Sequence, residues 1–201
     1  MRFKCENLSR GCKETSDKEG MIFHQTECIN RLVKCPCHAL MLQFHELIDH
    51  MMKQYIDVAP IINGIFGQKI ELKANLEAST KSTRILEIGQ NVFLEMKAFM
   101  KSGHFVHWIY LIGSPSEAKK FTFTIDYSIP NRTLVHSDYV ISINETCSSI
   151  VASSKCFAVK ISYFMKNFTD QEKFNYTIKI RNLKEEAKDD NVESGISDDD
   201  E

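Results

Sequence analysis

Nine of the fourteen Cys and His residues of this chain lie within its first 50 positions. They are Cys5, Cys12, His24, Cys28, Cys35, Cys37, His38, His45 and His50. A segment of fewer than about 55 residues rarely buries enough apolar surface to fold alone, and a bound metal ion can supply the missing stability. The spacing therefore predicts a small zinc-stabilised α+β module over residues 1–54.

The cellular compartment decides whether clustered cysteines bind metal or form disulfides. The first residues, MRFKCENLSR, lack the apolar stretch of a signal peptide, and no apolar run approaches the about 20 residues that span a bilayer. We therefore expect a cytoplasmic protein, with the nucleus as a second location. Thiols stay reduced there, which favours metal binding over disulfides.

The first four ligands form a plausible tetrahedral zinc set of three thiolates and one imidazole, namely Cys5, Cys12, His24 and Cys28. His24 and Cys28 are four residues apart, so on a helix they differ by about 40° and share a face. This set predicts one structural zinc ion. The alternative is that these are reduced surface thiols.

A second structural zinc ion is predicted at Cys35, Cys37, His45 and His50. The two histidines are five residues apart and would point about 140° apart on an ideal helix, so the helix must loosen or end near His50. His38 could replace Cys37, or the site could be absent and His45 merely a surface residue. Each predicted ion has four protein ligands and no open position, which indicates a folding role and no catalytic residue.

From about residue 70 to residue 183, apolar residues tend to recur at every second position, as they do in half-buried strands. The alternation is complete in KFTFTIDYSI (120–129) and recurs in 157–165 and 174–182. The run FVHWIYLIG (105–113) is apolar on both faces, as a central strand is. Further strands are predicted at 70–76, 84–88, 92–100 and 134–142. The pattern predicts an all-β antiparallel sandwich over residues 70–183.

Several shorter predictions accompany the sandwich. Residues 55–69 carry one proline and two glycines and are expected to be a connection, while Ser114, Pro115 and Glu117 have the order of a helix start. In 157–165 the alternation places Tyr163 and Met165 inward. Trp108 is expected in the core, His104 and His107 are expected to pair with backbone or water, and Cys147 and Cys156 are expected to be core or turn thiols.

The chain ends in an acidic segment. Residues 184–201 contain nine acids and two lysines, a net charge of −7, which leaves +5 on residues 1–183 because the whole chain carries −2. A segment of this composition cannot bury enough apolar surface to order itself, so we expect a solvated, disordered tail.

The finger residues and one stretch of the sandwich resemble the seven-in-absentia family. The spacing of Cys5, Cys12, His24 and Cys28, followed by CPC and two histidines, is similar to that family's paired zinc fingers. The stretch HWIYLIGSPSEAKKFTFTIDY (107–127) resembles part of its TRAF-like substrate-binding domain. The resemblance implies RING-type E3 ubiquitin ligases, in which a RING recruits the E2, while the fingers and sandwich dimerise and present substrates for degradation.

Three departures from the family pattern limit what the resemblance implies. The Cys and His residues beyond the fingers do not supply the eight ligands of a RING, so the chain is expected not to transfer ubiquitin alone. It is either a shortened relative or an incomplete gene model, and an E2 partner is expected only if a RING lies upstream. The second finger is shorter than in the family, and residues 77–89 lack the family's groove tryptophan, so family substrates need not bind.

The favoured hypothesis is a zinc-binding substrate-recognition part of such a ligase, which forms homodimers or heterodimers with relatives and binds extended peptides by strand addition. The alternative is a non-catalytic dimerising adaptor that regulates full-length relatives. A nucleic-acid binder ranks last, because residues 1–54 contain eight Lys/Arg against seven Asp/Glu and present no basic footprint. No membrane partner is expected.

Overall fold

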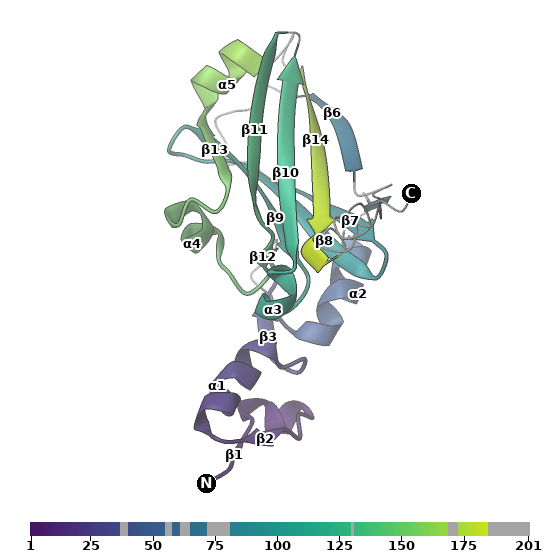
Figure 1. The fold of residues 1–201 in the computed structure, drawn as a ribbon, viewed down its shortest axis with the longest axis vertical. Coiled ribbons are helices and arrows are strands. Elements are labelled where there is room, and N and C mark those ends of the chain that lie inside the picture. The colour runs from purple at the N-terminus through teal and green to yellow at the C-terminus, as the bar shows by residue number, and fades with distance from the viewer. Residues whose placement is uncertain are drawn as a thin grey trace, which may run out of the picture.

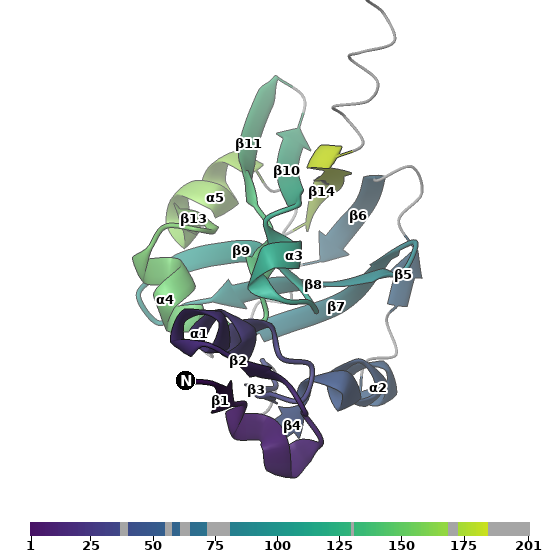
Figure 2. The same cartoon turned by 60° about the horizontal axis from the view of Figure 1, so that its bottom comes forward.

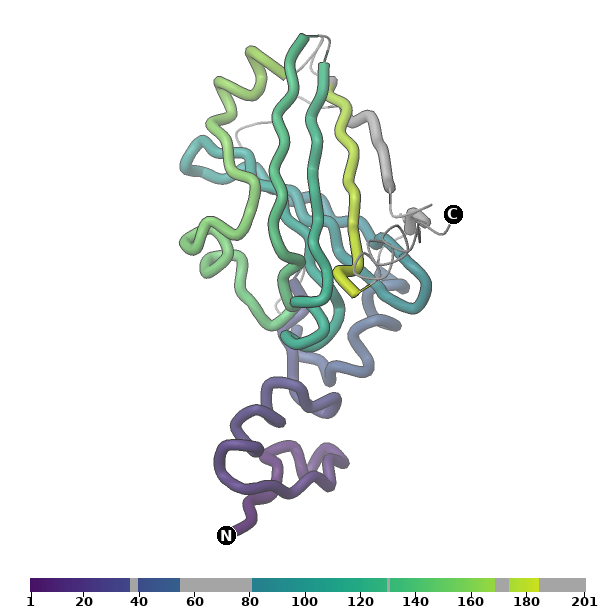
Figure 3. The backbone as a smooth tube through the Cα atoms, in the orientation of Figure 1, coloured from purple at the N-terminus to yellow at the C-terminus, as the bar shows by residue number. Residues whose placement is uncertain are grey.

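A computed structural model describes residues 1–36, 40–54, 58–60, 65–71, 81–129, 131–168 and 173–184, with backbone alone at 58–60, 65–71 and 173. A small N-terminal module lies at one end of the long axis and a larger β-sandwich at the other (Figure 1). Figure 3 traces the backbone from the module into the sandwich. Within the described ranges, no helix is long and apolar enough to cross a membrane.

The module begins with a hairpin followed by a helix. Strand β1 (Phe3–Lys4) pairs antiparallel with β2 (Thr15–Ser16), and the 3-10 helix η1 (Glu6–Arg10) lies between them. Helix α1 (Lys18–Glu27) starts where the Asp17 carboxylate accepts a hydrogen bond from the Gly20 backbone N–H at 2.8 Å. This N-cap explains why the helix begins there.

A second hairpin and helix follow. Strand β3 (Leu32–Lys34) pairs antiparallel with β4 (Met41–Gln43), which runs directly into α2 (Phe44–Gln54). One face of α2 is apolar, and its Leu47 and Met51 are fully buried. The short strands and helices of both units agree with the α+β class predicted for residues 1–54.

One sheet of the sandwich has four antiparallel strands in the order β11-β10-β14-β6. Its strands are β6 (Ile65–Glu71), β10 (Phe121–Ile129), β11 (Arg132–Tyr139) and β14 (Lys173–Asn182). In β10 the apolar residues at alternate positions are buried up to Tyr127, and Ile129 at the strand end is half-buried, with the polar residues on the other face. In 174–182 the alternation predicts Phe174, Tyr176, Ile178 and Ile180 inward, and all four are buried.

The other sheet has six strands, with the order β12-β9-β8-β7-β5 and with β13 also paired to β9. The β5–β7 and β9–β12 pairs are parallel, and the remaining pairs are antiparallel. The strands are β5 (Val58–Pro60), β7 (Lys81–Ile88), β8 (Asn91–Phe99), β9 (His104–Leu111), β12 (Ile141–Ser142) and β13 (Phe157–Lys160).

Aromatic side chains dominate the core between the two sheets. The Phe105 ring lies 5.1 to 6.2 Å from the rings of Phe99, Tyr127, Phe157, Phe164 and Phe174. Fully burying a side chain of this size stabilises the folded state by about 1.5–3 kcal/mol. The sandwich therefore has an apolar core that needs no metal ion.

A second apolar core covers the outer face of the six-stranded sheet. Val33, Leu47 and Met51 of the module pack in one cluster with Met96 and Trp108 of the sandwich. Figure 2 shows α2 against the β7–β8 side of this sheet. Residues 29–54 are thus attached to the sandwich, whereas the buried cluster of Cys5, Cys12, Met21 and Cys28 stands apart from both cores.

The prediction of one strand over 157–165 was wrong in its second half. Strand β13 ends at Lys160, and α5 (Ile161–Phe168) follows. The residues at positions 161, 164, 165 and 168 have helical spacing, and a helix buries Phe164 and Phe168 together, while Tyr163 is 52% exposed. Met165 is half-buried at the edge of the inter-sheet core.

Other predictions for the sandwich had mixed outcomes. The predicted helix start is present as α3 (Pro115–Ala118) with a capping box from Ser114, whereas α4 (Cys147–Ala152) was not predicted. The range 55–69, expected to be a connection, contains β5 and most of β6. Part of the strand predicted at 70–76 lies outside the described residues, as does the acidic segment beyond residue 184.

Candidate metal centre and its junction with the sandwich

Four predicted ligands come together in the N-terminal module. One ligand atom each from Cys5, Cys12, His24 and Cys28 lies within 4.8 Å of the other three. The Cys5 and Cys28 Sγ atoms are 3.8 Å apart, and Cys12 Sγ is 3.3 Å from His24 Nε2. A tetrahedral zinc ion with its usual bond lengths requires edges of about 3.8 Å between sulfurs and about 3.6 Å between sulfur and nitrogen. The four residues fit a zinc ion, and this cluster can bind one.

The local sequence explains why the first two cysteines point inward. Cys5 caps η1, and its Sγ accepts hydrogen bonds from the backbone N–H of Asn7 at 3.4 Å and from the Asn7 side chain at 3.6 Å. Gly11 ends η1 at φ 96°, a left-handed conformation that favours glycine, and the chain then turns back to Cys12. His24 and Cys28 follow from the last turn and the C-cap of α1.

The thiol pKa values differ within the cluster. Burial acts to raise the pKa of Cys5, but the hydrogen bonds from Asn7 and the neighbouring thiols outweigh it and lower the pKa. Burial raises the pKa of Cys28 to about 11. Because zinc binds thiolates, metal binding must release protons from this cluster, and affinity is expected to fall in acid.

The second predicted ligand set is only partly covered by the structure. Cys35 is buried in the outer-face core, with its Sγ 3.7 Å from Met51 Sδ. His45 is exposed at the start of α2, and His50 is half-buried near its end. Cys37 and the alternative ligand His38 lie outside the described residues, so the second zinc ion stays a prediction.

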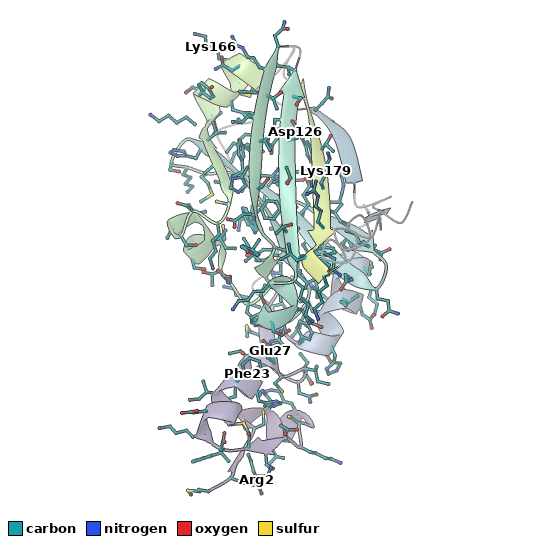
Figure 4. All side chains as sticks on the ribbon, viewed as in Figure 1. Arg2, Phe23, Glu27, Asp126, Lys166 and Lys179 are labelled. Carbon is teal, nitrogen blue, oxygen red and sulfur yellow. The ribbon has the colours of Figure 1, made fainter. Side chains whose placement is uncertain are left out.

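Polar contacts join the end of α1 to the sandwich. The Glu27 carboxylate accepts hydrogen bonds from the Ser116 backbone N–H at 3.1 Å and from its hydroxyl at 2.8 Å. The Asn144 side chain donates to the Thr26 carbonyl at 3.4 Å. Burial acts to raise the pKa of Glu27, but hydrogen bonds from Ser114 and Ser116 lower it overall. Figure 4 shows Glu27 where the module meets the sandwich, and Phe23 on the module side.

Arg31 completes this junction from the buried side. Its Nη1 donates to the Cys28 carbonyl at 2.8 Å, its Nη2 to the Gly113 carbonyl at 3.4 Å, and its Nε to Asn144 Oδ1 at 3.3 Å. The guanidinium also lies 4.0 Å from the centre of the Phe44 ring. One side chain therefore contacts the metal cluster, the second hairpin unit and the sandwich.

Sequence reasoning missed a buried polar network between the sheets. Glu95 accepts from Tyr176 Oη at 2.5 Å and lies 3.0 Å from both Lys97 Nζ and His107 Nε2, while His107 Nδ1 bonds Tyr127. The available signal was Glu95 and Lys97 two positions apart in an apolar strand, which places both on one face. His104 and His107 were expected to pair with backbone or water. His107 instead pairs with side chains, and His104 Nδ1 also lies 3.3 Å from a side-chain atom, Ser102 Oγ.

The electrostatics of this network indicate a structural role. Burial acts to raise the pKa of Glu95, but His107, Lys97 and Tyr176 hold it at about 2. Burial lowers the pKa of His107 and raises that of Tyr176. The Glu95 and His107 side chains are fully buried and pair with one another at 3.0 Å, as in a structural ion pair. Cys147 and Cys156, the two thiols beyond the module, also fit a structural role. Cys156 is buried, which raises its pKa to about 11, and Cys147 is half-buried in α4.

Comparison with known families locates the recognised part of the chain. Residues 88–181 match the family model described as Sina, TRAF-like domain. The matched range runs from the end of β7 through β8, β9, β10 and β11 into β14. No curated protein matches the chain. The match and the antiparallel strands of this region support a Sina-type TRAF-like domain, which indicates protein partners.

Proposed function

We propose that this chain is the zinc-binding substrate-recognition part of a seven-in-absentia-like ubiquitin ligase and acts in ubiquitin-dependent protein degradation. The observation that carries the proposal is the Sina-type TRAF-like match, which spans strands of both sheets. The sandwich would bind the partner protein. The N-terminal module, attached through Glu27, Arg31 and α2, would hold a fixed position beside it.

The proposed mode of recognition is addition of an extended peptide strand to a sheet edge. Strand β11 ends the four-stranded sheet and pairs on one side with β10. Its Val135 and Tyr139 are 52% and 57% exposed and fall on the outward face, where they would lie beside alternate side chains of an added strand. Backbone hydrogen bonds would supply affinity, and these side chains would supply selectivity.

We further propose that two structural zinc ions hold the module. The first would be bound by Cys5, Cys12, His24 and Cys28, which the geometry supports. The second would be bound by Cys35, Cys37, His45 and His50, supported by the spacing alone. Both ions would have a folding role, since four protein ligands leave no position for a substrate. Zinc analysis of the purified chain should give two ions per chain, and one ion would reject the second site.

We propose, as a second candidate function, a non-catalytic dimerising adaptor that regulates full-length relatives. The Cys and His residues outside the two predicted sets are too few for the eight ligands of a RING. In both readings the chain would act as a homodimer or with RING-bearing relatives in the cytoplasm. A recognition subunit would increase ubiquitination of a bound partner by such a relative, whereas an adaptor would decrease it.

The test couples partner binding to ubiquitin transfer. Proteins captured by the chain would be ubiquitinated in a purified system with E1, E2 and a RING-bearing relative, with and without the chain. We expect Val135→Arg/Tyr139→Arg to abolish both capture and the effect on transfer. The matched control is Ile22→Arg/Phe23→Arg, which alters two exposed residues of α1 and should change neither. Equal loss of capture in both variants would contradict the proposal. Ubiquitin transfer that is the same with and without the chain would contradict it as well.

A further inference from the structure

A cavity of about 750 Å³ lies where the module meets the outer face of the six-stranded sheet. Its apolar lining includes Val33 of β3, Met96 of β8 and Trp108 of β9. Its rim carries Lys34, Lys81 and Glu145. The cavity is therefore built from elements of both parts of the molecule. Its lining includes Cys35, a predicted ligand of the second zinc ion, but none of Cys5, Cys12, His24 and Cys28 and no residue of β11.

Trp108 lines this cavity and carries an unused hydrogen-bond donor. The side chain is 1% exposed, and its Nε1–H has no hydrogen-bond partner in the part of the chain that the structure covers. A buried donor without an acceptor costs about 1–3 kcal/mol. An oxygen acceptor that reached this buried N–H would remove that cost.

Arg31 brings a buried positive charge to the same cavity. It is 6% exposed, and its hydrogen bonds go to neutral oxygens of Cys28, Gly113 and Asn144. The carboxylates of Glu27 and Glu117 interact with it electrostatically, but within the described ranges none forms a direct ion pair with it, and Glu27 bonds Ser116 instead. Buried charges are usually paired, so this cation favours an anionic ligand.

The charge at the rim has the same sign. Lys34 and Lys81 are exposed, while the only acidic residue among the described lining residues, Glu145, already pairs with Lys155 at 2.8 Å. The cavity thus combines an apolar floor, an orphaned donor, a buried cation and two free-standing rim lysines. These features together select a carboxylate-bearing peptide segment with at least one apolar side chain.

We propose that the chain's own acidic C-terminal segment, residues 185–201, binds in this cavity. The segment has nine acids and one lysine, a net charge of −8, which leaves +6 on residues 1–184 because the whole chain carries −2. Between its acids lie the apolar Val192 and Ile196. A carboxylate of the segment would accept from Trp108 Nε1–H beside Arg31, and one of these apolar residues would fill the floor.

The position of the last described strand supports this occupant. The Leu183 backbone N–H bonds the Lys120 carbonyl at 2.9 Å, which fixes the exit of the chain beside α3. Leu183 and Pro115 line one neighbouring hollow, and Pro115 also lines the cavity. Seventeen residues can extend to about 55 Å, so the segment reaches the cavity easily, and tethering raises its effective concentration to about the millimolar range.

The test uses Trp108, the only tryptophan of the chain, as a reporter within the cavity. Its indole Nε1–H gives a single NMR signal, which shifts when the group donates to a carboxylate. In the full chain with zinc, we expect replacement of all nine acids of residues 185–201, each Asp by Asn and each Glu by Gln, to move this signal toward the position of a free indole. Raising the salt from about 0.02 M to about 0.5 M should move it the same way, because exposed charges are screened. Excess free peptide 185–201 should restore the original position.

Matched lysine variants separate a cavity effect from a general charge effect. Lys34→Gln/Lys81→Gln should weaken the interaction and shift the indole signal, whereas Lys166→Gln/Lys179→Gln should not. The latter two lysines are exposed and lie on the sandwich away from the module (Figure 4). The proposal would be overturned if neutralising the segment left the indole signal in place, or if both lysine pairs shifted it equally. An acidic peptide of unrelated sequence that shifts the signal of the unaltered chain, when neutralising the segment does not, would assign the cavity to a partner.

Discussion

Residues 1–28 and the sandwich achieve a buried interior by opposite means. The first region has only Cys5, Cys12, Met21 and Cys28 in its buried cluster, and three of these four are predicted metal ligands. The sandwich packs aromatic rings between two sheets and needs no ion. The comparison teaches that one chain can depend on metal at one end and on apolar burial at the other, with residues 29–54 attached to the second.

Removing the metal ion should affect the two regions very differently, and this is the largest predicted effect. Structural zinc contributes about 10–16 kcal/mol to the folding of a small module, which is comparable to a domain's whole stability. Chelation, or Cys28→Ser, should therefore abolish amide protection in residues 3–28 and leave β8, β9 and β10 protected. Hydrogen exchange measured by mass spectrometry tests this. Cys147→Ser is the matched control, since Cys147 is half-buried in α4 outside the cluster. Unchanged amide protection of residues 3–28 after chelation would show that this region does not depend on metal.

The converse experiment weakens the aromatic core. Phe105→Ala should destabilise the sandwich by about 3–5 kcal/mol, because the cavity left behind cannot be refilled by the five surrounding rings. Denaturant unfolding of the zinc-loaded chain gives the value. Tyr163→Ala, at a 52% exposed position, should cost far less. If metal affinity fell together with sandwich stability, the two regions would not be independent.

A third prediction sharpens the comparison inside the sandwich, where one polar network interrupts the apolar core. The pKa of Glu95 lies at about 2, below its unfolded value, so its contribution is present above the unfolded pKa and is lost as pH falls from about 4 to 2. The shift corresponds to about 3 kcal/mol. His107, whose pKa is also lowered, adds a loss that begins as pH falls below about 6.5.

Substitutions separate this network from general acid unfolding. Glu95→Gln should flatten the stability profile between about pH 4 and pH 2 and destabilise the protein at neutral pH, since Lys97 loses its buried partner. The double variant Glu95→Leu/Lys97→Met should recover most of that loss. Urea unfolding at a series of pH values gives both results, and a profile of Glu95→Gln parallel to the wild type would contradict the assignment.

Sequence patterns predicted local structure better than they predicted how segments associate. The alternation in 120–129 fixed the inward face of β10, and the order Ser114, Pro115, Glu117 identified the α3 cap, because both depend on neighbouring residues. In 157–165 the alternation continued by chance for a few residues into a helical pattern, since periods of 2 and 3.6 overlap in short apolar runs.

The candidate site divides in the same way. The ligand spacing predicted Cys5, Cys12, His24 and Cys28, because a hairpin and one helix bring them together locally. Contacts between distant parts had no such signal. The pairing of Glu95 with Tyr176 and the packing of Met51 near Trp108 depend on tertiary register, which no local spacing encodes.

The smallest predicted effect concerns the boundary between the two regions. Glu27→Gln replaces a carboxylate that accepts two hydrogen bonds from Ser116 at a partly exposed position, so it should cost about 0.5–1.5 kcal/mol or less. Because the pKa of Glu27 is lowered in the folded state, its contribution is lost as pH falls through that pKa. Faster amide exchange in residues 113–118, with the β10 core unchanged, would show that the contact restrains the module locally. Glu19→Gln, on the same helix and exposed, is the control. Equal exchange in both variants would show that the remaining contacts, those of α2, Arg31 and Asn144, hold the two regions together without Glu27.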